Sequence, residues 1–315
     1  MQLGSQAPGE AIRQTTWLCV CLAAVLLLAA ASNTVAQQPN VLLIVSDDQG
    51  FGDLASHGNA KIRTPVLDAL ADSGARFDNF HCYPLCAPTR AGLLTGRYNL
   101  RCGVWGVTHG KDTMASEEVT LAEVFQQAGY RTGLVGKWHL GEHYPHTPRA
   151  QGFDHFFGFL TGHHNNYFDT TLIRNGEPTP TKGYITDVLT DAAIEFMRAE
   201  GDQPFFCYLP YNAPHAPWQV PDDYFWPYAR KGVPETARTA YAMITNLDDN
   251  LGRLLKFLED RSLAENTIVV FLSDNGPNGV RFNAGLKGIK SSLHEGGTRV
   301  PCFVRWPRRI AAGTR

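Results

Sequence analysis

The sequence has 315 residues, of which 43% are hydrophobic and 18% charged, and its formal net charge at pH 7 is -2. This apolar content and low net charge exclude an intrinsically disordered chain and are typical of one large globular domain or two modest ones. Basic residues are not in excess, so the composition does not indicate nucleic acid or an anionic membrane surface as a partner. If the protein binds anions, its positive charge must be concentrated at one site.

The N-terminus predicts a signal peptide over residues 1–36. Arg13 precedes an apolar run over 17–31, and the small residues at 34–36 (TVA) offer a cleavage point. An uncleaved membrane anchor is the alternative, but the run is shorter than the roughly 20 apolar residues that span a bilayer. We therefore expect an exported protein, in a periplasmic, extracellular or lysosomal-type compartment, with no stable membrane association.

Removal of that segment leaves an odd number of cysteines. In an exported protein, an odd number means that at least one cysteine is unpaired or chemically altered. Pairing is not readable from the sequence, and the cysteines other than Cys86 are equally compatible with buried thiols. The five are Cys82, Cys86, Cys102, Cys207 and Cys302.

Apolar runs and helical periodicity predict strands that alternate with helices along the chain. Short apolar runs such as 40–46 (NVLLIVS) and 267–273 (TIVVFLS) are typical of strands buried on both faces. The region 143–182 is rich in His, Asn, Gly and Pro, and we predict a long irregular insertion there, over one end of the sheet. In chain order, the predicted elements are a strand at 40–46, helices at 64–74, 87–95 and 120–128, a strand at 131–139, a helix at 185–199, a strand at 205–209, a helix at 235–263, and strands at 267–273 and 302–306.

This alternation predicts an α/β fold with a mostly parallel central sheet and helices on both faces. Polar residues lie at the end of four of the predicted strands or shortly after it. Sites in parallel α/β sheets assemble at the carboxyl ends of strands, so we expect these side chains to converge although they are far apart in sequence. They are Asp47 and Asp48, Lys137 and His139, His215, and Asp274 and Asn275.

Two of these groups predict a divalent-cation site. Asp47-Asp48 and Asp274-Asn275 supply three carboxylates and one amide carbonyl, which are hard oxygen donors that suit Ca²⁺ or Mg²⁺ better than Zn²⁺. A single pair of this kind is more often a solvated turn or a helix cap. Two pairs, each directly after a buried apolar strand, favour a metal site, because paired carboxylates there repel each other unless a cation lies between them.

The most specific stretch is Cys86-Ala87-Pro88-Thr89-Arg90, followed by AGLLTGR up to Arg97. It resembles the signature of the sulfatase family, C-x-P-S-R followed by x-x-L-L-T-G-R, and departs from it only at Thr89, where Ser is usual. The alternative is a buried structural cysteine at a helix start. Three further blocks extend the resemblance, in the family's order, over about 40–307. They are 136–141 (GKWHLG), 213–217 (APHAP), and 288–301 with its G-I-K and E-G-G-T-R-V-P segments.

The resemblance implies an alkaline-phosphatase-like fold and a divalent cation, usually Ca²⁺ and less often Mg²⁺. It also implies a substrate that is a sulfated small molecule or carbohydrate. The cation ligands that it implies are Asp47, Asp48, Asp274, Asn275 and the modified Cys86. The residues that it places around the sulfate are Arg90, Lys137, His139, His215 and Lys290, with Lys287 as the alternative to Lys290.

In this family a formylglycine-generating enzyme oxidises the cysteine that corresponds to Cys86 to an aldehyde, which hydrates to a diol. One hydroxyl attacks sulfur and expels the alcohol, and the other then expels sulfate by C–O cleavage, so that one difficult step becomes two easier ones. The resemblance implies Asp274 as the base that activates the diol, His215 with Lys290 as donors to the leaving oxygen, and His139 as the base during sulfate release. Conversion of Cys86 also explains the odd number of cysteines.

Two alternatives to a sulfatase stay open. One is a phosphodiester or phosphonate monoester hydrolase of the same superfamily, and the other is a non-catalytic remnant that binds sulfated glycans. Family members usually continue beyond the position of Arg315, so we expect residues 37–315 to be a catalytic domain truncated at its C-terminal end, without the smaller C-terminal domain. The identity of the substrate is not readable, but we expect the specificity pocket to be shaped by the region around His143, His146, His163, His164 and Asn165.

Overall fold

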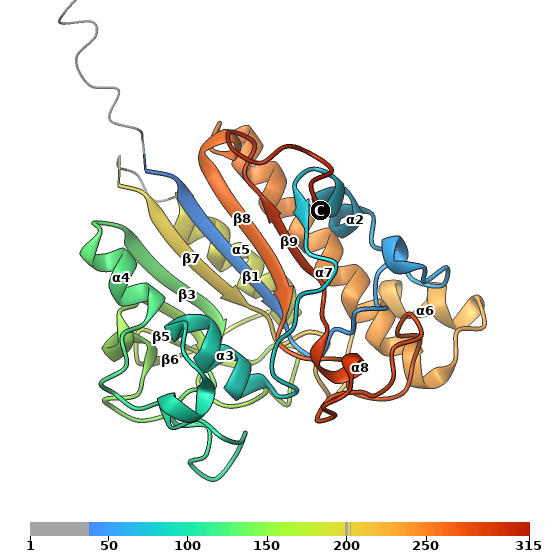
Figure 1. Ribbon diagram of the computed structural model, residues 1–315, viewed down its shortest axis with the longest axis horizontal. Helices are drawn as coiled ribbons and strands as arrows, with labels where there is room; N and C mark the ends of the chain where they lie inside the picture. Colours follow the sequence, from blue (N-terminus) through green and yellow to red (C-terminus); the bar gives the residue numbers. More distant parts are fainter. Residues whose placement is uncertain (1–37, 199–200, 202) are drawn as a thin grey trace, which may run out of the picture. The chain divides into compact units, whose positions relative to one another are not determined.

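A nine-stranded sheet, in the order β2-β9-β8-β1-β7-β3-β4-β5-β6, organises the residues that the structure, a computed structural model, describes (Figure 1). These are residues 38–198, 201 and 203–315, and the predicted signal peptide lies outside them. The five strands from β8 to β4 are mutually parallel, and antiparallel strands extend the sheet at both edges. In sheet order the strands are β2 (Ala75–Arg76), β9 (Cys302–Arg305), β8 (Thr267–Ser273), β1 (Asn40–Ser46), β7 (Phe205–Pro210), β3 (Arg131–Lys137), β4 (His155–Phe159), β5 (Thr171–Arg174) and β6 (Glu177–Pro180).

Strand β1 lies between β7 and β8 and sets the register of the carboxyl edge of the sheet. Ser46 of β1 pairs with Ser273 of β8, and Val45 pairs with Pro210 of β7. Because the three strands are parallel, the segments that follow them leave the sheet at the same edge. The polar residues predicted to form a site therefore emerge next to one another.

Helices cover both faces of the sheet. Successive side chains of a strand point to opposite faces, and in β1 Leu42 and Ile44 belong to one core cluster while Leu43 and Val45 belong to another. Figure 1 shows α3 and α4 in front of the sheet and α5 and α7 behind it. The first cluster includes residues of α2 (Pro65–Asp72), α5 (Ile185–Arg198) and α7 (Glu235–Asp260), and the second includes residues of α3 (Cys86–Thr95) and α4 (Leu121–Gln127).

Shorter helices complete the described part of the chain. Helix α6 (Asp222–Arg230) packs against α7, where the rings of Tyr228 and Tyr241 meet edge to face. The remaining helices are α8 (Glu295–Thr298) and the 3-10 helices η1 (Ala55–His57), η2 (Asn99–Cys102), η3 (Pro148–Gln151) and η4 (Ala264–Asn266). Over the ranges described, none of the helices has the length and apolar character needed to cross a bilayer.

The predicted α/β fold, with a parallel central sheet and helices on both faces, is confirmed. Every predicted strand and helix is present; β1 and β8 have the predicted bounds, and the others differ at either end by at most three residues. Helix α4 begins with a capping box, in which Thr120 accepts from the Glu123 N–H and Glu123 accepts from the Thr120 N–H.

The prediction of an irregular insertion over 143–182 is wrong, because this region contributes β4, β5 and β6. Strand β4 (HFFGF) pairs parallel with β3 and is almost fully buried, but Gly158 interrupts its apolar run. Strands β5 and β6 form a hairpin whose Asn175-Gly176 turn has positive φ at both residues, a turn that the dipeptide itself indicates. Helix α6 was not predicted from the sequence, because Pro227 lies inside it and a proline usually kinks or ends a helix.

Candidate active site

The segments after β1 and β8 form one buried cluster of oxygen atoms. The Asp274 N–H donates to the carbonyl of Ser46 at 3.1 Å, and the Asp48 N–H donates to Asp274 Oδ1 at 3.2 Å. Asn275 Nδ2 donates to Asp48 Oδ1 at 2.7 Å. Asp47, Asp48, Asp274 and Asn275 are all 0% exposed. The two predicted pairs of ligands thus meet in space, as their positions at parallel strand ends led us to expect.

Arg90 and Lys137 place positive charge against this cluster. Arg90, on α3, donates from Nε and Nη2 to Asp274 Oδ2 at 3.1 and 2.7 Å. Lys137 is the last residue of β3, and its Nζ lies 2.5 Å from Asp47 Oδ2. Both cationic side chains are fully buried. Buried charges of this kind are stable only when paired, so the ion pairs hold all four side chains in place.

Lys290, and not Lys287, reaches the cluster. Lys290 Nζ lies 2.6 Å from Asp48 Oδ1, and the Lys290 side chain is 15% exposed. The Lys290 N–H donates to the carbonyl of Pro277 at 3.0 Å, which holds the loop over the strand ends. Lys287 is exposed to solvent. Of the two lysines considered from the sequence, Lys290 has the geometry to bind an anion at this site.

The ion pairs set the charge state of the carboxylates. Burial tends to raise the pKa of Asp274, but Arg90, Lys137 and Lys290 outweigh it and hold that pKa well below its usual range. Burial and repulsion from Asp274 raise the pKa of Asp47. Burial and the neighbouring carboxylate thus disfavour the charged form of Asp47, and a bound cation would favour it.

Cys86 is the first residue of α3 and lies against the same cluster. It is 2% exposed, and its Sγ belongs to a group of potential ligand atoms, with one each from Asp47, Asp48 and His215, that all lie within 4.8 Å of one another. Burial raises the pKa of Cys86 to about 11, although Lys137 opposes it. The first N–H groups of a helix and its dipole favour negative charge at this position.

His139 follows β3 in the left-handed region of the backbone, with φ 62°, and is buried. Its Nε2 lies 3.0 Å from the carbonyl of Val107, and because a carbonyl only accepts, Nε2 carries the proton. Its Nδ1 is buried and has no hydrogen-bond partner among the described residues. Burial and then Lys137 lower the pKa of His139 well below its usual value, so that the ring is neutral and Nδ1 offers a lone pair.

His215 lies in the proline-flanked segment after β7, and its Nε2 is 3.6 Å from Asp48 Oδ2. Its Nδ1 lies 2.5 Å from the carbonyl of Ala216, so Nδ1 is a donor and Nε2 is the nitrogen that faces the cluster. The exposed ring of His163 stacks on the ring of His215, with 5.3 Å between centroids and 11° between planes. His163 thus joins the site from the region that we expected to shape specificity.

The donor set fits a divalent cation. Asp47 Oδ1, Asp48 Oδ2 and Asn275 Oδ1 are buried and have no hydrogen-bond partner among the described residues. Leaving a buried polar atom unpaired costs about 1–3 kcal/mol. All three are hard oxygen donors of the kind that Ca²⁺ and Mg²⁺ prefer. These atoms are thus available to coordinate a metal ion.

A buried ion pair that the sequence did not reveal supports the loop after β1. Arg281 donates from Nε and Nη2 to the carboxylate of Asp53, at 2.9 and 2.7 Å, and from Nη2 to the carbonyl of Asp48 at 2.9 Å. Asp53 also accepts from the Gly50 N–H at 2.8 Å. The two charged side chains are 1% and 0% exposed. Since 228 residues separate them and no motif links them, only the folded chain shows the pair.

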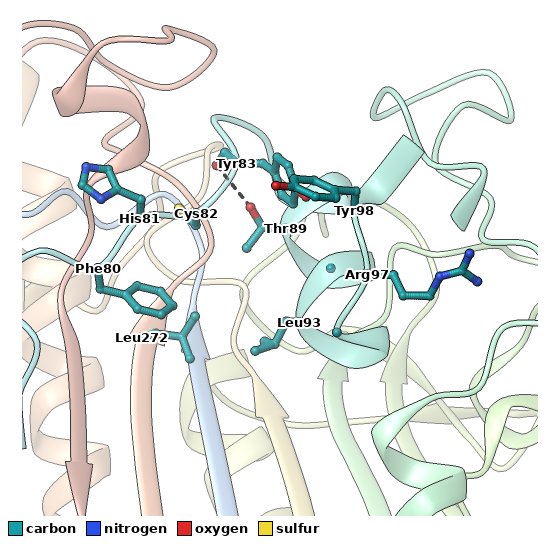
Figure 2. Close-up of a pocket in the computed structure, with 11 residues that line it drawn as sticks. Phe80, His81, Cys82, Tyr83, Thr89, Leu93, Arg97, Tyr98 and Leu272 are labelled. Atoms are coloured by element: carbon teal, nitrogen blue, oxygen red, sulfur yellow. Dashed lines mark hydrogen bonds between the residues drawn. The ribbon is translucent and has the colours of Figure 1, made fainter. Parts of the chain in front are cut away.

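A cavity of about 330 Å³ runs along α3, beside Cys82 and Tyr83 (Figure 2). None of the predicted catalytic or metal-binding residues lines it. Figure 2 shows the hydroxyl of Thr89 directed at the segment before α3, where it donates to the carbonyl of Tyr83 at 3.1 Å. The hydroxyl at the position where Ser is usual thus stabilises the entry into α3.

Comparison with known proteins gives a consistent set of similarities. The model of the family described as Sulfatase matches residues 39–315. The chain is 34% identical over 332 residues to the uncharacterized sulfatase YdeN of Escherichia coli (strain K12). This alignment covers 88% of this chain and 59% of that protein. The chain is also 33% identical over 312 residues to the N-acetylgalactosamine-6-sulfatase of Homo sapiens. That alignment covers 88% of this chain and 58% of the human protein.

Solved structures show the same similarity. The crystal structure of Ps i-CgsB in complex with k-i-k-neocarrahexaose matches with a TM-score of 0.83 and 34% identity, and the match covers 89% of this chain and 68% of that chain. The chain spans between 58% and 59% of the length of the two curated relatives above.

Proposed function

The chain belongs to the sulfatase family, and on that premise we propose that the protein hydrolyses sulfate esters to an alcohol and inorganic sulfate at the site described above. The observation that carries this proposal is the position of Cys86, whose Sγ lies in one group of ligand atoms with Asp47, Asp48 and His215 at the start of a helix. The relatives are longer than the matched region, so the activity of the whole protein is part of the proposal.

The cationic residues answer the main difficulty of the reaction. A sulfate ester resists nucleophiles because its anionic oxygens repel them, and negative charge grows in the transition state. Arg90, Lys137 and Lys290 are arranged around the cluster before substrate arrives, so they can stabilise that charge without reorganisation. A buried position strengthens each of these interactions relative to water.

We assign a calcium ion to the oxygen cluster, with magnesium as the alternative. The ligands would be Asp47, Asp48, Asp274, Asn275 and the converted Cys86. The three buried oxygens that lack a hydrogen-bond partner in the described part of the chain support this assignment. When bound, the cation would act as a Lewis acid on a sulfate oxygen.

We assign the nucleophile to Cys86 after its conversion to formylglycine by a formylglycine-generating enzyme during maturation. Burial raises the pKa of the Cys86 thiol, so the unconverted thiol is a poor nucleophile, which supports the need for conversion. The hydrated aldehyde would supply the attacking hydroxyl. The helix start at Cys86 favours the negative charge that this hydroxyl acquires.

The surrounding residues would move protons. Asp274 Oδ2 is held by Arg90, so Oδ1 is the oxygen with an open lone pair, and we propose it as the acceptor from the attacking hydroxyl. His215 Nε2, with Lys290, would donate to the leaving oxygen. His139 Nδ1, buried and without a partner among the described residues, would accept the proton as sulfate leaves.

We propose a sulfated carbohydrate as the substrate class, within the wider class of sulfated small molecules. The name of the human relative refers to a sulfated amino sugar, and the matched crystal structure holds an oligosaccharide. We further propose that the protein is exported, with residues 1–36 as its signal peptide.

The test compares esters that share one leaving group. The protein is produced in a host that makes formylglycine and is assayed with 4-nitrophenyl sulfate, bis(4-nitrophenyl) phosphate and 4-nitrophenyl phenylphosphonate. We expect the highest kcat/KM for the sulfate. A higher value for the diester or the phosphonate would assign the site to the other hydrolases of the superfamily. Binding of a sulfated saccharide with no release of inorganic sulfate would indicate a non-catalytic binding protein.

The matched variants are Cys86→Ala and Cys302→Ala. Both cysteines are buried, but Cys302 lies on β9, outside the cluster. Loss of a nucleophile removes on the order of 10⁴-fold or more of kcat. We expect this loss for Cys86→Ala and near-normal turnover for Cys302→Ala.

A further inference from the structure

A second cavity, of about 540 Å³, is lined by residues 158–161 and 163–166, by Glu142 and His143, and by Thr171 and Ile173; we call it the loop cavity. Its wall is shared with the site. The ring of His163 lies on that of His215, and a Cβ added to Gly162 would lie 2.7 Å from Nε2 of His139. The loop cavity and the site therefore meet at His163, a lining residue whose ring contacts that of His215.

The wall of the loop cavity is fixed by tertiary hydrogen bonds. The side chain of Asn212 accepts from the N–H of His164 and donates to the carbonyl of His164, both at 3.3 Å. Gln219 Nε2 donates to the carbonyl of Asn165 at 3.0 Å. The loop is thus held through its backbone by side chains of other segments, and the side chains of Asn165 and Asn166 stay exposed.

The two compartments differ in charge. The cluster holds Arg90, Lys137 and Lys290, whereas the loop cavity has neither Lys nor Arg among its lining residues and contains one carboxylate, Glu142. Its other polar side chains are imidazoles, amides and hydroxyls, from His143, Thr161, His163, His164, Asn165, Asn166 and Thr171.

These groups match the chemistry of an uncharged sugar. An amide and a neutral imidazole each donate and accept hydrogen bonds, as a sugar hydroxyl does. The volume lies in the range of small-ligand pockets, roughly 300–1,000 Å³. A second sulfate or a uronate carboxylate would meet Glu142 and no compensating cation in this cavity.

We infer that the loop cavity binds an uncharged sugar unit next to the sulfated one, and that Glu142 selects against an anionic neighbour. This inference rests on the proposed function, because the sulfated unit is taken to occupy the cluster. It narrows the substrate class to saccharides in which the sulfated unit is linked to a neutral hexose or N-acetylhexosamine.

The experiment uses two disaccharides that carry the same 6-sulfated hexosamine and differ only in the linked unit, which is a neutral hexose or a hexuronate. We expect kcat/KM to be higher for the neutral disaccharide by about tenfold or more, because the carboxylate of Glu142 repels a like charge in the cavity. Equal values, or a preference for the hexuronate, would overturn the inference.

Variants assign the selection to one side chain. Glu142→Gln should raise kcat/KM for the hexuronate substrate by about tenfold or more, with little change for the neutral one. Glu259→Gln is the matched control, because Glu259 is an exposed carboxylate in the last turn of α7, outside the cavity lining. The same gain in the control, or no gain in Glu142→Gln, would contradict the role of Glu142.

Binding without turnover separates this inference from the proposed function. Saturation-transfer NMR with the two desulfated disaccharides reports contact with the protein whether or not a sulfate ester is cleaved. We expect contact for the neutral disaccharide, with signals that weaken in Asn166→Ala, and none for the hexuronate. If 4-nitrophenyl sulfate is hydrolysed but the neutral disaccharide makes no contact, the inference fails while the proposed function stands. If no ester is hydrolysed but the contact is seen, the proposed function fails and the loop cavity remains a sugar site.

Discussion

Three carboxylates, three cations and a cysteine occupy a volume from which water is largely excluded. Each charged side chain has a partner of opposite charge within hydrogen-bond distance, at Asp47, Asp48 and Asp274 alike. Removing one partner from such a pair leaves an uncompensated buried charge, which costs far more than the pair itself contributes. Such an arrangement stabilises a fold poorly, which supports the proposal that these side chains bind a charged ligand.

The two lysines near the end of the chain test this interpretation. Lys290→Ala removes a cation paired with Asp48, and we expect kcat to fall by about 10²–10³, the effect of losing one donor to a transition-state oxyanion. Lys287→Ala changes an exposed lysine three residues away, and we expect the kcat of the parent protein. Steady-state kinetics with 4-nitrophenyl sulfate measure both. A larger loss in Lys287→Ala would reverse the assignment.

The convergence of polar side chains at the strand ends could be predicted from the sequence, and other contacts could not. Asp47, Asp274 and His215 follow apolar runs or lie in short motifs, so the local sequence pattern predicts their positions. The Arg281–Asp53 pair and the stacking of His163 on His215 arise from tertiary approach between segments that share no motif. A charged residue buried by distant segments looks, in sequence, like any exposed one.

At the scale of elements, β3, β4 and β7 approach one another more closely than a side chain allows. An added Cβ at Gly136, where φ is +133°, would lie 2.0 Å from the carbonyl oxygen of Pro210, and one at Gly158 would lie 1.9 Å from that of Gly136. These glycines let the strand that carries Lys137 sit against its neighbours. Gly158 also interrupts the apolar pattern of β4, which is one reason why this strand was not predicted from the sequence.

Gly136→Ala tests this close approach. We expect the free energy of unfolding to fall by more than about 4 kcal/mol, because backbone must move, and catalysis to fall with it as Lys137 shifts. Gly129→Ala is the control: Gly129 also has positive φ, but no atom of the described residues lies within 4 Å of the added Cβ, so only the left-handed penalty of about 1–2 kcal/mol applies. Urea denaturation gives both values, and equal losses would count against the contact.

A carboxylate of α7 caps α2. Asp248 accepts from the N–H groups of Val66 and Leu67 at 3.1 and 2.7 Å, and burial raises the pKa of Asp248 from 3.8 to about 6 despite these bonds. Because this pKa is higher in the folded state, the folded state binds the proton more tightly. The contribution of Asp248 to stability is thus greatest below about pH 4 and is lost as pH rises to about 6.

Asp248→Asn removes this titration. We expect the free energy of unfolding of the parent protein, measured relative to the variant, to fall between pH 4 and pH 6 and to stay level above, in the window that the two pKa values set. Urea denaturation at several pH values gives the difference. A relative gain of stability with rising pH would mean that the two N–H donors outweigh burial.

At the scale of the whole molecule, one metal site would tie together the ends of β1 and β8 and the start of α3. A ligand that binds only the folded state at 100 times its Kd stabilises it by about 2.7 kcal/mol. We expect a chelator to lower Tm and Ca²⁺ to restore it. In Asp47→Asn, which loses one ligand charge, both responses should be smaller. If neither the chelator nor Ca²⁺ changes the Tm, the proposal that the site binds a cation is wrong.

The central claim is that Cys86 becomes the nucleophile of a sulfatase, and the mass of one peptide tests it most directly. The protein is purified from a host that makes formylglycine, digested with trypsin, and the peptide Phe77–Arg90 is analysed by mass spectrometry with a known sulfatase from the same cells as control. We predict that Cys86 has lost its sulfur and carries an aldehyde, while Cys82 in the same peptide stays a thiol. An intact thiol at Cys86, with the control sulfatase converted, would contradict the account.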